Sequence, residues 1–160
     1  MRKITFILLG LISGTAFAQE EATETAQASA DIVSPITIEG QGDLNFGKVA
    51  NNAAGTVVVG TDSDISVSTL SQIGVTTPSA ATFDVTAANG FSYSITLPES
   101  VNLNNGSEDI TVDAFNHDAE GNTTGTGAVQ TIGVGATLNV ASGQATGNYT
   151  GNFNVSVAYE

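Results

Sequence analysis

The sequence predicts an all-β protein, an immunoglobulin-like antiparallel β-sandwich in a form with or without its final strand. From about residue 31 onward, apolar residues alternate with polar ones in short segments, and Gly, Asn, Asp and Ser separate these segments. No window beyond the first 18 residues shows an apolar stripe with helical spacing. Period-two alternation is typical of strands with one face on a core and the other in water.

About ten strands are expected at the regular spacing of a sandwich. They are centred on residues 36–38, 44–46, 57–59, 65–67, 83–87, 91–97, 110–114, 132–134, 138–140 and 153–159. Pro35 beside the first segment predicts an edge strand or a kink, because Pro cannot donate to a ladder. Asn89-Gly90 predicts a hairpin between its flanking strands, and Asn105-Gly106 predicts another turn.

The N-terminus predicts export. Arg2 and Lys3 precede a nine-residue apolar core (residues 4–12), and Ala16-Phe17-Ala18 forms a small-x-small cleavage site, so residues 1–18 have the parts of a secretory signal peptide. Nine residues are too few to span about 30 Å of hydrocarbon. Residues 19–30 (QEEATETAQASA) predict a flexible acidic leader. Residues 31–160 then form one sandwich domain of a bacterial periplasmic, cell-surface or secreted protein, with no membrane insertion after cleavage.

The composition excludes several classes of protein. The chain has 3 Lys and Arg against 16 Asp and Glu, for a formal charge of −13, so binding to nucleic acid is not expected. It has no Cys, which excludes a disulfide framework and a thiolate zinc site. No cofactor is expected. The charge also repels like copies unless salt or cations screen it.

Tyr149 is the most informative residue near the C-terminus. The pattern Gly147-x-Tyr149-x-Gly151 fits the tyrosine corner that precedes the penultimate strand of immunoglobulin-like sandwiches. If Tyr149 marks that strand, the final strand is missing and an unpaired edge remains over the core. Another subunit can supply such a strand. The alternative is that Tyr149 is an ordinary strand residue.

The leader contains a candidate donor strand. Ala26, Ala28, Ala30 and Ile32 alternate with polar residues, as a strand that buries one face would. Alanine fills little of an apolar pocket, so a solvated leader is the competing interpretation.

Three segments resemble a known bacterial family, the domain-of-unknown-function family 4402. These are ADIVSPITIEGQGDLNFGKV (residues 30–49), ATFDVTAANGFSYSITL (81–97) and LNVASGQATGNYTGNFNVSVAY (138–159). The motif Leu44-Asn45-Phe46-Gly47 carries much of the likeness. More distantly, the chain is similar to spore-coat-type and archaic fimbrial subunits, although those usually carry a Cys in the first strand. The resemblance implies an immunoglobulin-like sandwich with a role in surface assembly, and it transfers no catalytic residues.

Little in the sequence predicts chemistry. His117 is the single histidine and no G-x-S-x-G motif is present, so an enzyme is not expected. Asn116, Asp118 and Glu120 occupy positions one, three and five of a Ca²⁺-loop-like pattern, but Gly127 stands where the bidentate acid belongs. A weak Ca²⁺ site and a polar hairpin loop are both open interpretations.

Two functions follow as hypotheses. The first is an exported, non-enzymatic structural or interaction protein, a fimbrial-subunit-like or cell-surface assembly sandwich that uses strand complementation and has self-assembly or pilus partners. The alternative is a monomeric periplasmic or secreted binding module with a weak Ca²⁺ site. The two differ in whether residues 19–34 are needed for stability, in cis or in trans.

Overall fold

The computed structural model describes residues 21–74 and 77–160. The predicted signal peptide therefore lies outside the described residues. The chain divides into two units between Asp31 and Ile32. Residues 21–31 form neither helix nor strand, and every one of them is exposed. Across the described ranges, no helix is long and apolar enough to cross a membrane.

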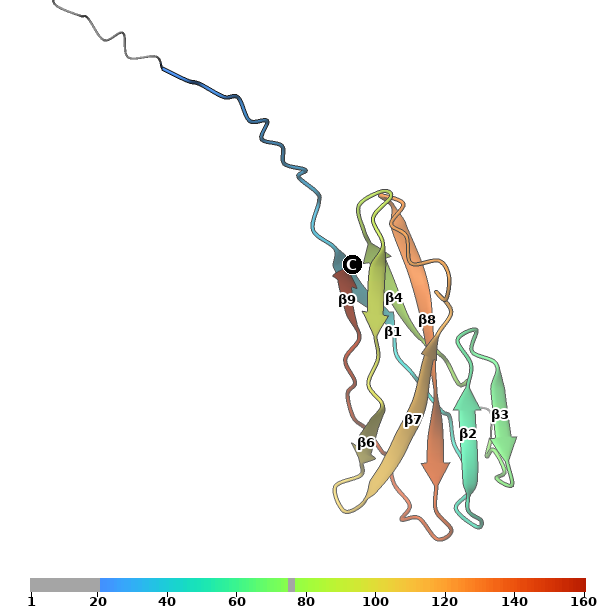
Figure 1. Ribbon diagram of the computed structural model, residues 1–160. Helices are drawn as coiled ribbons and strands as arrows, with labels where there is room; N and C mark the ends of the chain where they lie inside the picture. The colour runs from blue at the N-terminus through green and yellow to red at the C-terminus, as the bar shows by residue number, and fades with distance from the viewer. Residues whose placement is uncertain (1–20, 75–76) are drawn as a thin grey trace, which may run out of the picture. The chain divides into compact units, whose positions relative to one another are not determined.

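The second unit is all-β and antiparallel, as predicted (Figure 1). Its strands within the described residues are β1 (Thr37–Gly42), β2 (Gly55–Val59), β3 (Ile65–Ser68), β4 (Ala81–Thr86), β5 (Tyr93–Thr96), β6 (Ser100–Asn104), β7 (Asp109–His117), β8 (Val129–Val140) and β9 (Ser156–Tyr159). One sheet has the order β1-β4-β8-β2-β3, with β7 pairing both β8 and β6. The other consists of β5 and β9. The sheets do not close on themselves, which agrees with a sandwich.

Strand β8 organises the larger sheet. Val134 pairs with Ala81 of β4 and with His117 of β7, so these two strands lie on opposite edges of β8. Further along, Thr137 pairs with Val58 of β2 and again with β7. Strands β4 and β2 therefore share one edge of β8, one after the other, and β7 takes the other edge.

Two expectations about connections have different outcomes. The turn at Asn105-Gly106 joins the paired strands β6 and β7, as predicted. The predicted hairpin around Asn89-Gly90 is wrong. The turn forms, with the Phe91 N–H donating to the Ala88 carbonyl at 3.2 Å, but β4 pairs with β1 and β8 while β5 pairs with β9. This turn carries the chain from one sheet to the other.

The strands also differ from expectation at four places. Residues 44–46 form only an isolated bridge between Asn45 and Ser79. The two strands expected at residues 132–134 and 138–140 are one continuous strand, β8. In the expected strand at residues 153–159, only β9 is paired, and β6 was not anticipated.

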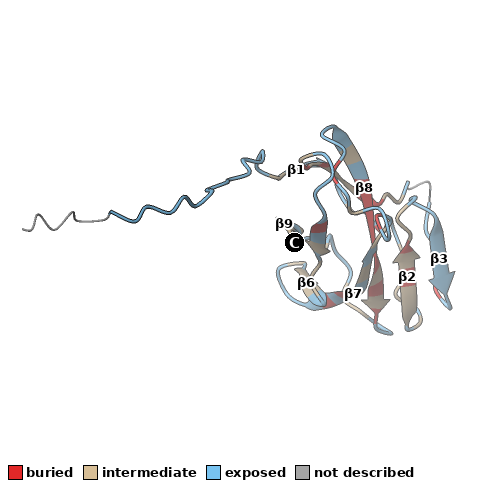
Figure 2. Ribbon diagram, turned by 45° about the horizontal axis from the view of Figure 1, so that its top comes forward, coloured by how far each residue is buried: buried red, intermediate tan, exposed pale blue. Residues whose placement is uncertain are grey.

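The core falls into two clusters rather than one. The larger gathers around β2, β7 and the second half of β8, and its buried residues are Phe46, Val57, Val59, Leu70, Ala80, Ile110, Val112, Ala136, Leu138 and Val140. The smaller gathers around β4 and β5, with Val85, Ala87, Tyr93, Ala119 and Ile132. Both clusters contain inward residues of β8, along which buried positions run in Figure 2.

Candidate functional site

The first part of β1 is closed against the C-terminal strand. Ile36 and Ile38 pack on the smaller cluster together with Val157 and Tyr159 of β9. The Tyr159 hydroxyl accepts a hydrogen bond from the Ala88 N–H at 2.7 Å and donates one to the Ser34 carbonyl at 2.9 Å. We call this region the closed end.

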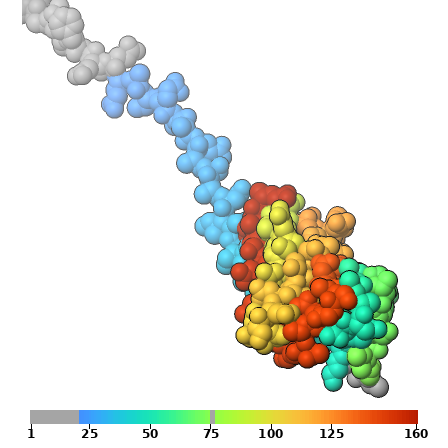
Figure 3. Space-filling view, turned by 90° about the horizontal axis from the view of Figure 1, so that it is seen from below, coloured from blue at the N-terminus to red at the C-terminus, as the bar shows by residue number. Residues whose placement is uncertain are grey.

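The second part of β1 borders an open groove. A cavity of about 570 Å³ lies between residues 40–46 on one side and residues 149–153 on the other. Its apolar lining comes from β4, β6, β7 and the segments after β1 and before β9, and it comprises Leu44, Phe46, Ala81, Phe83, Val101, Leu103, Val112, Phe115 and Phe153. We call this cavity the groove. Figure 3 shows the C-terminal residues in red, lying along β5 and β6 in yellow.

Three phenylalanine rings form the floor of the groove. The Phe153 ring lies 5.1 Å from that of Phe115 and 6.2 Å, edge-on, from that of Phe83. All three side chains are only half-buried. Phe83 and Phe153 belong to neither core cluster. The aromatic floor therefore lies where the core is interrupted, with apolar surface open to solvent.

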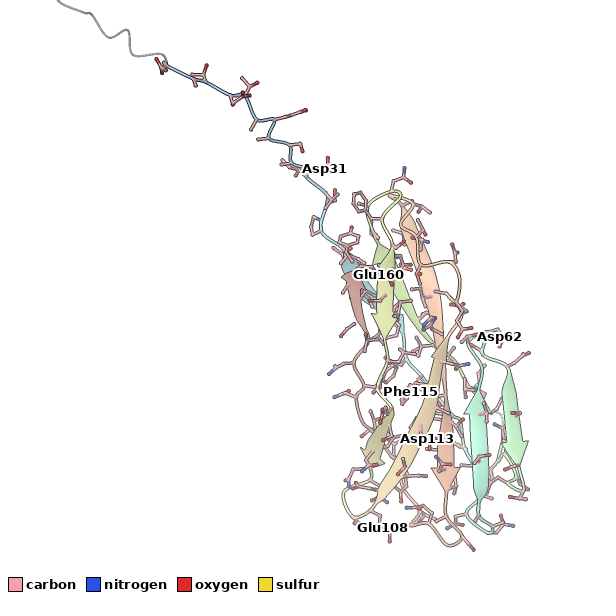
Figure 4. All side chains as sticks on the ribbon, in the orientation of Figure 1. Asp31, Asp62, Glu108, Asp113, Phe115 and Glu160 are labelled. Carbon is pink, nitrogen blue, oxygen red and sulfur yellow. The ribbon has the colours of Figure 1, made fainter. Side chains whose placement is uncertain are left out.

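A β-bulge turns Phe115 toward the groove. Strand β7 shifts its register between Asp113 and Asn116, and Ala114 has a φ of 48°, in the left-handed region. Before the bulge, Ile110 and Val112 face the core; after it, Phe115 is the inward residue (Figure 4). The expected alternation of residues 110, 112 and 114 on one face is therefore wrong at Ala114, which is exposed.

Gly40 on β1 leaves the floor uncovered. Gly40 pairs with Phe83 across the β1–β4 ladder, and a Cβ at Gly40 would lie 3.9 Å from Phe83 Cε1. The inward positions of this segment thus change from Ile36 and Ile38 to Gly40. A register shift between Gly40 and Gly42 then places Gly42 opposite Thr82, on the other face of the sheet. Across the described ranges, β1 pairs only with β4, so its other edge is open along the groove.

The opposite wall also has an open backbone. Thr150 exchanges two backbone hydrogen bonds with Asn104, at 2.9 and 3.1 Å. Ladder pairing resumes only where Ser156 meets Thr96. Residues 151–155, between these points, have no ladder partner among the described residues. Two open stretches of backbone therefore border the groove.

Tyr149 stands at one end of this wall. Its hydroxyl donates to the Ala145 carbonyl at 2.9 Å and accepts from Gln144 Nε2 at 3.1 Å, while its ring packs against the larger cluster. A hydroxyl bonded to the backbone four residues upstream is the arrangement of a tyrosine corner. The corner sets the direction in which residues 150–155 leave the turn.

The other predicted site residues lie away from the groove or on the separate unit. Ala26, Ala28 and Ala30 are exposed in residues 21–31, and Ile32 is 98% exposed. Their role as a donor strand stays a prediction.

The candidate Ca²⁺ residues are spread over a strand end and a turn. Asn116 pairs with Gly135 inside β7, Asp118 Oδ1 accepts from the Gly133 N–H at 2.9 Å, and Glu120 lies in the following turn. No group of three or more His, Asp or Glu side chains is placed to hold a metal within the described part of the chain. A Ca²⁺ site stays a prediction.

A smaller cavity of about 200 Å³ lies beside Asp118 and is also lined by Tyr93 and Gln130. Burial raises the pKa of the Tyr93 hydroxyl. Within the described residues, neither this hydroxyl nor Gln130 Oε1 has a hydrogen-bond partner.

The fold and the groove define a class of protein: an all-β sandwich domain with a gap in its core between two open strand edges. The chain matches the family model described as Domain of unknown function (DUF4402) over residues 36–159, and it belongs to this family. No curated protein and no solved structure matches the chain.

Proposed function

We propose that this protein is an exported, non-enzymatic assembly subunit whose groove accepts an extended strand from a partner. The observation that carries the proposal is the interruption of the core at the half-buried rings of Phe83, Phe115 and Phe153. The interruption lies between the open edge of β1 and the open backbone of residues 151–155.

An inserted strand would satisfy both walls at once. Unpaired backbone groups away from water are costly, and strand addition supplies their partners. The same strand would cover the three rings, and removing apolar surface from water contributes roughly 25 cal/mol per Å². Main-chain pairing would give affinity, and the groove floor would select the side chains that fit.

The chemistry of the lining supports binding over catalysis. Asp43 is the single charged side chain among the residues that line the groove. A catalytic cleft brings titratable groups together around a reacting atom. Besides Asp43, the lining offers only one such group, the Tyr149 hydroxyl, which is bonded to the Ala145 carbonyl. The predicted signal peptide and the distant likeness to fimbrial subunits support a place in a periplasmic or cell-surface assembly.

The test blocks the groove without touching the rest of the sandwich. Gly40→Leu places a side chain over Phe83, in the space that an inserted strand would use. Thr37→Leu is the matched control, because Thr37 lies on the opposite, exposed face of β1. In extracts of cells that produce the full chain, we expect the wild type and Thr37→Leu in species larger than a monomer.

Gly40→Leu should migrate as a monomer in these extracts. The purified variant should have the circular dichroism spectrum of a folded β protein. A wild type that is monomeric in these extracts would overturn the proposal. So would a Gly40→Leu variant that remains in the large species.

A further inference from the structure

We propose that the strand accepted by the groove is residues 25–30 of a second copy of this chain. The inference rests on the proposed function and names its partner. It follows from three properties of the groove: the size of its floor, its charge and its length.

The floor selects small side chains. The rings of Phe83 and Phe115 lie 6.2 Å and 5.1 Å from the ring of Phe153, and all three line the floor of the groove. A strand that crosses these rings has little room for bulky side chains on the face that meets them. Ala26, Ala28 and Ala30 present three methyl groups on one face of an extended segment. The alanines that would fill a deep pocket poorly thus suit a floor made of aromatic rings, on which small side chains allow the backbone to lie close.

The charge pattern of the leader selects the same segment. The groove lining offers no positive side chain and one negative one, Asp43. A carboxylate buried there would have no ion-pair partner, which is costly. Residues 25–30 (TAQASA) carry no charge, whereas Glu24 precedes them and Asp31 follows them. The uncharged stretch is therefore bounded by residues that belong outside the groove.

The lengths agree as well. The β1 side of the groove runs from residue 40 to residue 46. Six residue steps at about 3.3 Å span about 20 Å, and the five steps across the uncharged residues 25–30 span about 17 Å when extended. Ile32 lies beyond the alanines on the same face, where it can cover apolar surface at the end of the groove.

Exchange between copies has a consequence for assembly. Each copy has one donor segment and one groove, so the contact is head-to-tail. Head-to-tail contacts build rings or open filaments rather than closed dimers with two-fold symmetry. Purified protein should therefore associate without any other component.

The decisive variants lie in the leader, whose exposed residues 21–31 contribute no strand to the sandwich. Ala28→Trp puts a bulky ring on the face that meets the phenylalanines. Ser29→Trp puts the same ring on the opposite face and is the matched control. Light scattering of the purified protein should show oligomers for the wild type and Ser29→Trp, and an association at least tenfold weaker for Ala28→Trp.

Engineered cysteines report the contact directly, because the chain has no Cys of its own. One copy carries Gly40→Cys, and a second carries a Cys in place of Ala26, Ala28 or Ala30. At least one of these mixtures should form a disulfide-linked dimer under mild oxidation, whereas mixtures with Gln27→Cys or Ser29→Cys should not.

The outcomes separate this inference from the proposed function. If Gly40→Leu abolishes assembly in cell extracts but Ala28→Trp leaves it intact, the groove takes another strand and only the inference fails. If none of these mixtures links, but a single chain that carries Gly40→Cys together with Ala28→Cys forms an internal disulfide, the donor acts in cis and the second copy is refuted. If Gly40→Leu has no effect, the proposed function itself fails.

Discussion

The closed end and the groove lie along the same strand and behave in opposite ways. At the closed end, Ile36 and Ile38 meet β9, and Tyr159 ties Ser34 to Ala88. At the groove, Gly40 takes the inward position and the opposite wall has no ladder partner in the described residues. The difference shows that the gap in the core is confined to the groove. The sandwich is sealed wherever side chains reach across it and open where β1 has none.

The largest expected effect contrasts a residue from each region. Val85 is fully buried in the smaller cluster at the closed end, so Val85→Ala should lower the free energy of unfolding by about 2–3 kcal/mol. Phe153→Ala removes a larger side chain but from the open floor of the groove, so in the monomer it should cost only about 1–2 kcal/mol. Urea unfolding of both variants in the Ala28→Trp background measures the two values. A greater loss for Phe153→Ala would mean that the floor is already covered.

The next effect concerns the hydroxyl that fastens the closed end. Tyr159→Phe removes two hydrogen bonds to the backbone and should cost about 1–2 kcal/mol in thermal or urea unfolding. The ring remains, so its contact with Phe91, whose centroid lies 6.0 Å away, should survive. Ser94→Ala is the control, because its hydroxyl makes one long bond of 3.4 Å at an exposed site. Equal losses for the two variants would show that Tyr159 does not fasten β1.

Salt is expected to have a moderate effect on association through the groove and none at the closed end. The formal charge of −13 makes copies repel, and added salt screens that repulsion. Raising ionic strength from about 0.05 M to about 0.5 M should strengthen association by about threefold or more, measured by light scattering. Weakening by salt would instead indicate an attractive ionic contact with the donor.

The smallest effect concerns Tyr93, at the closed end. Burial raises the pKa of the Tyr93 hydroxyl, so the folded state holds this proton more tightly than the unfolded state does. The contribution of this difference to stability is complete below about pH 10. It is lost as the pH rises through the raised value. Tyr93→Phe should change stability by less than about 1 kcal/mol at pH 7, because the hydroxyl lacks a partner in the described residues. It should also flatten the alkaline decline seen in thermal unfolding, and an unchanged decline would contradict this cause.

Much of the fold could be predicted from local patterns. Alternation in residues 81–87 and 110–112 identified strands that the structure contains, because half-buried strands impose that period. Pairing could not be predicted in the same way. Asn89-Gly90 fixes a turn, but which sheet the next strand joins depends on tertiary contacts of β5 with β9.

The groove could be predicted only in part. Tyr149 pointed to a corner near the C-terminus, and its hydroxyl bonds the Ala145 carbonyl. The aromatic floor could not be predicted, because an alternating sequence pattern does not reveal the bulge at Ala114 that turns Phe115 inward. Gly40 was the available signal, because a glycine inside a strand indicates an uncovered neighbour or a close approach.

Hydrogen–deuterium exchange tests most directly whether the groove takes a strand from a second copy. The amides of residues 151–155 should exchange rapidly in the monomeric Ala28→Trp variant and become protected in the assembled wild type. The amides of β9, at the closed end, should be protected in both. Protection of residues 151–155 already in the monomer, or none on assembly, would contradict a strand-accepting groove.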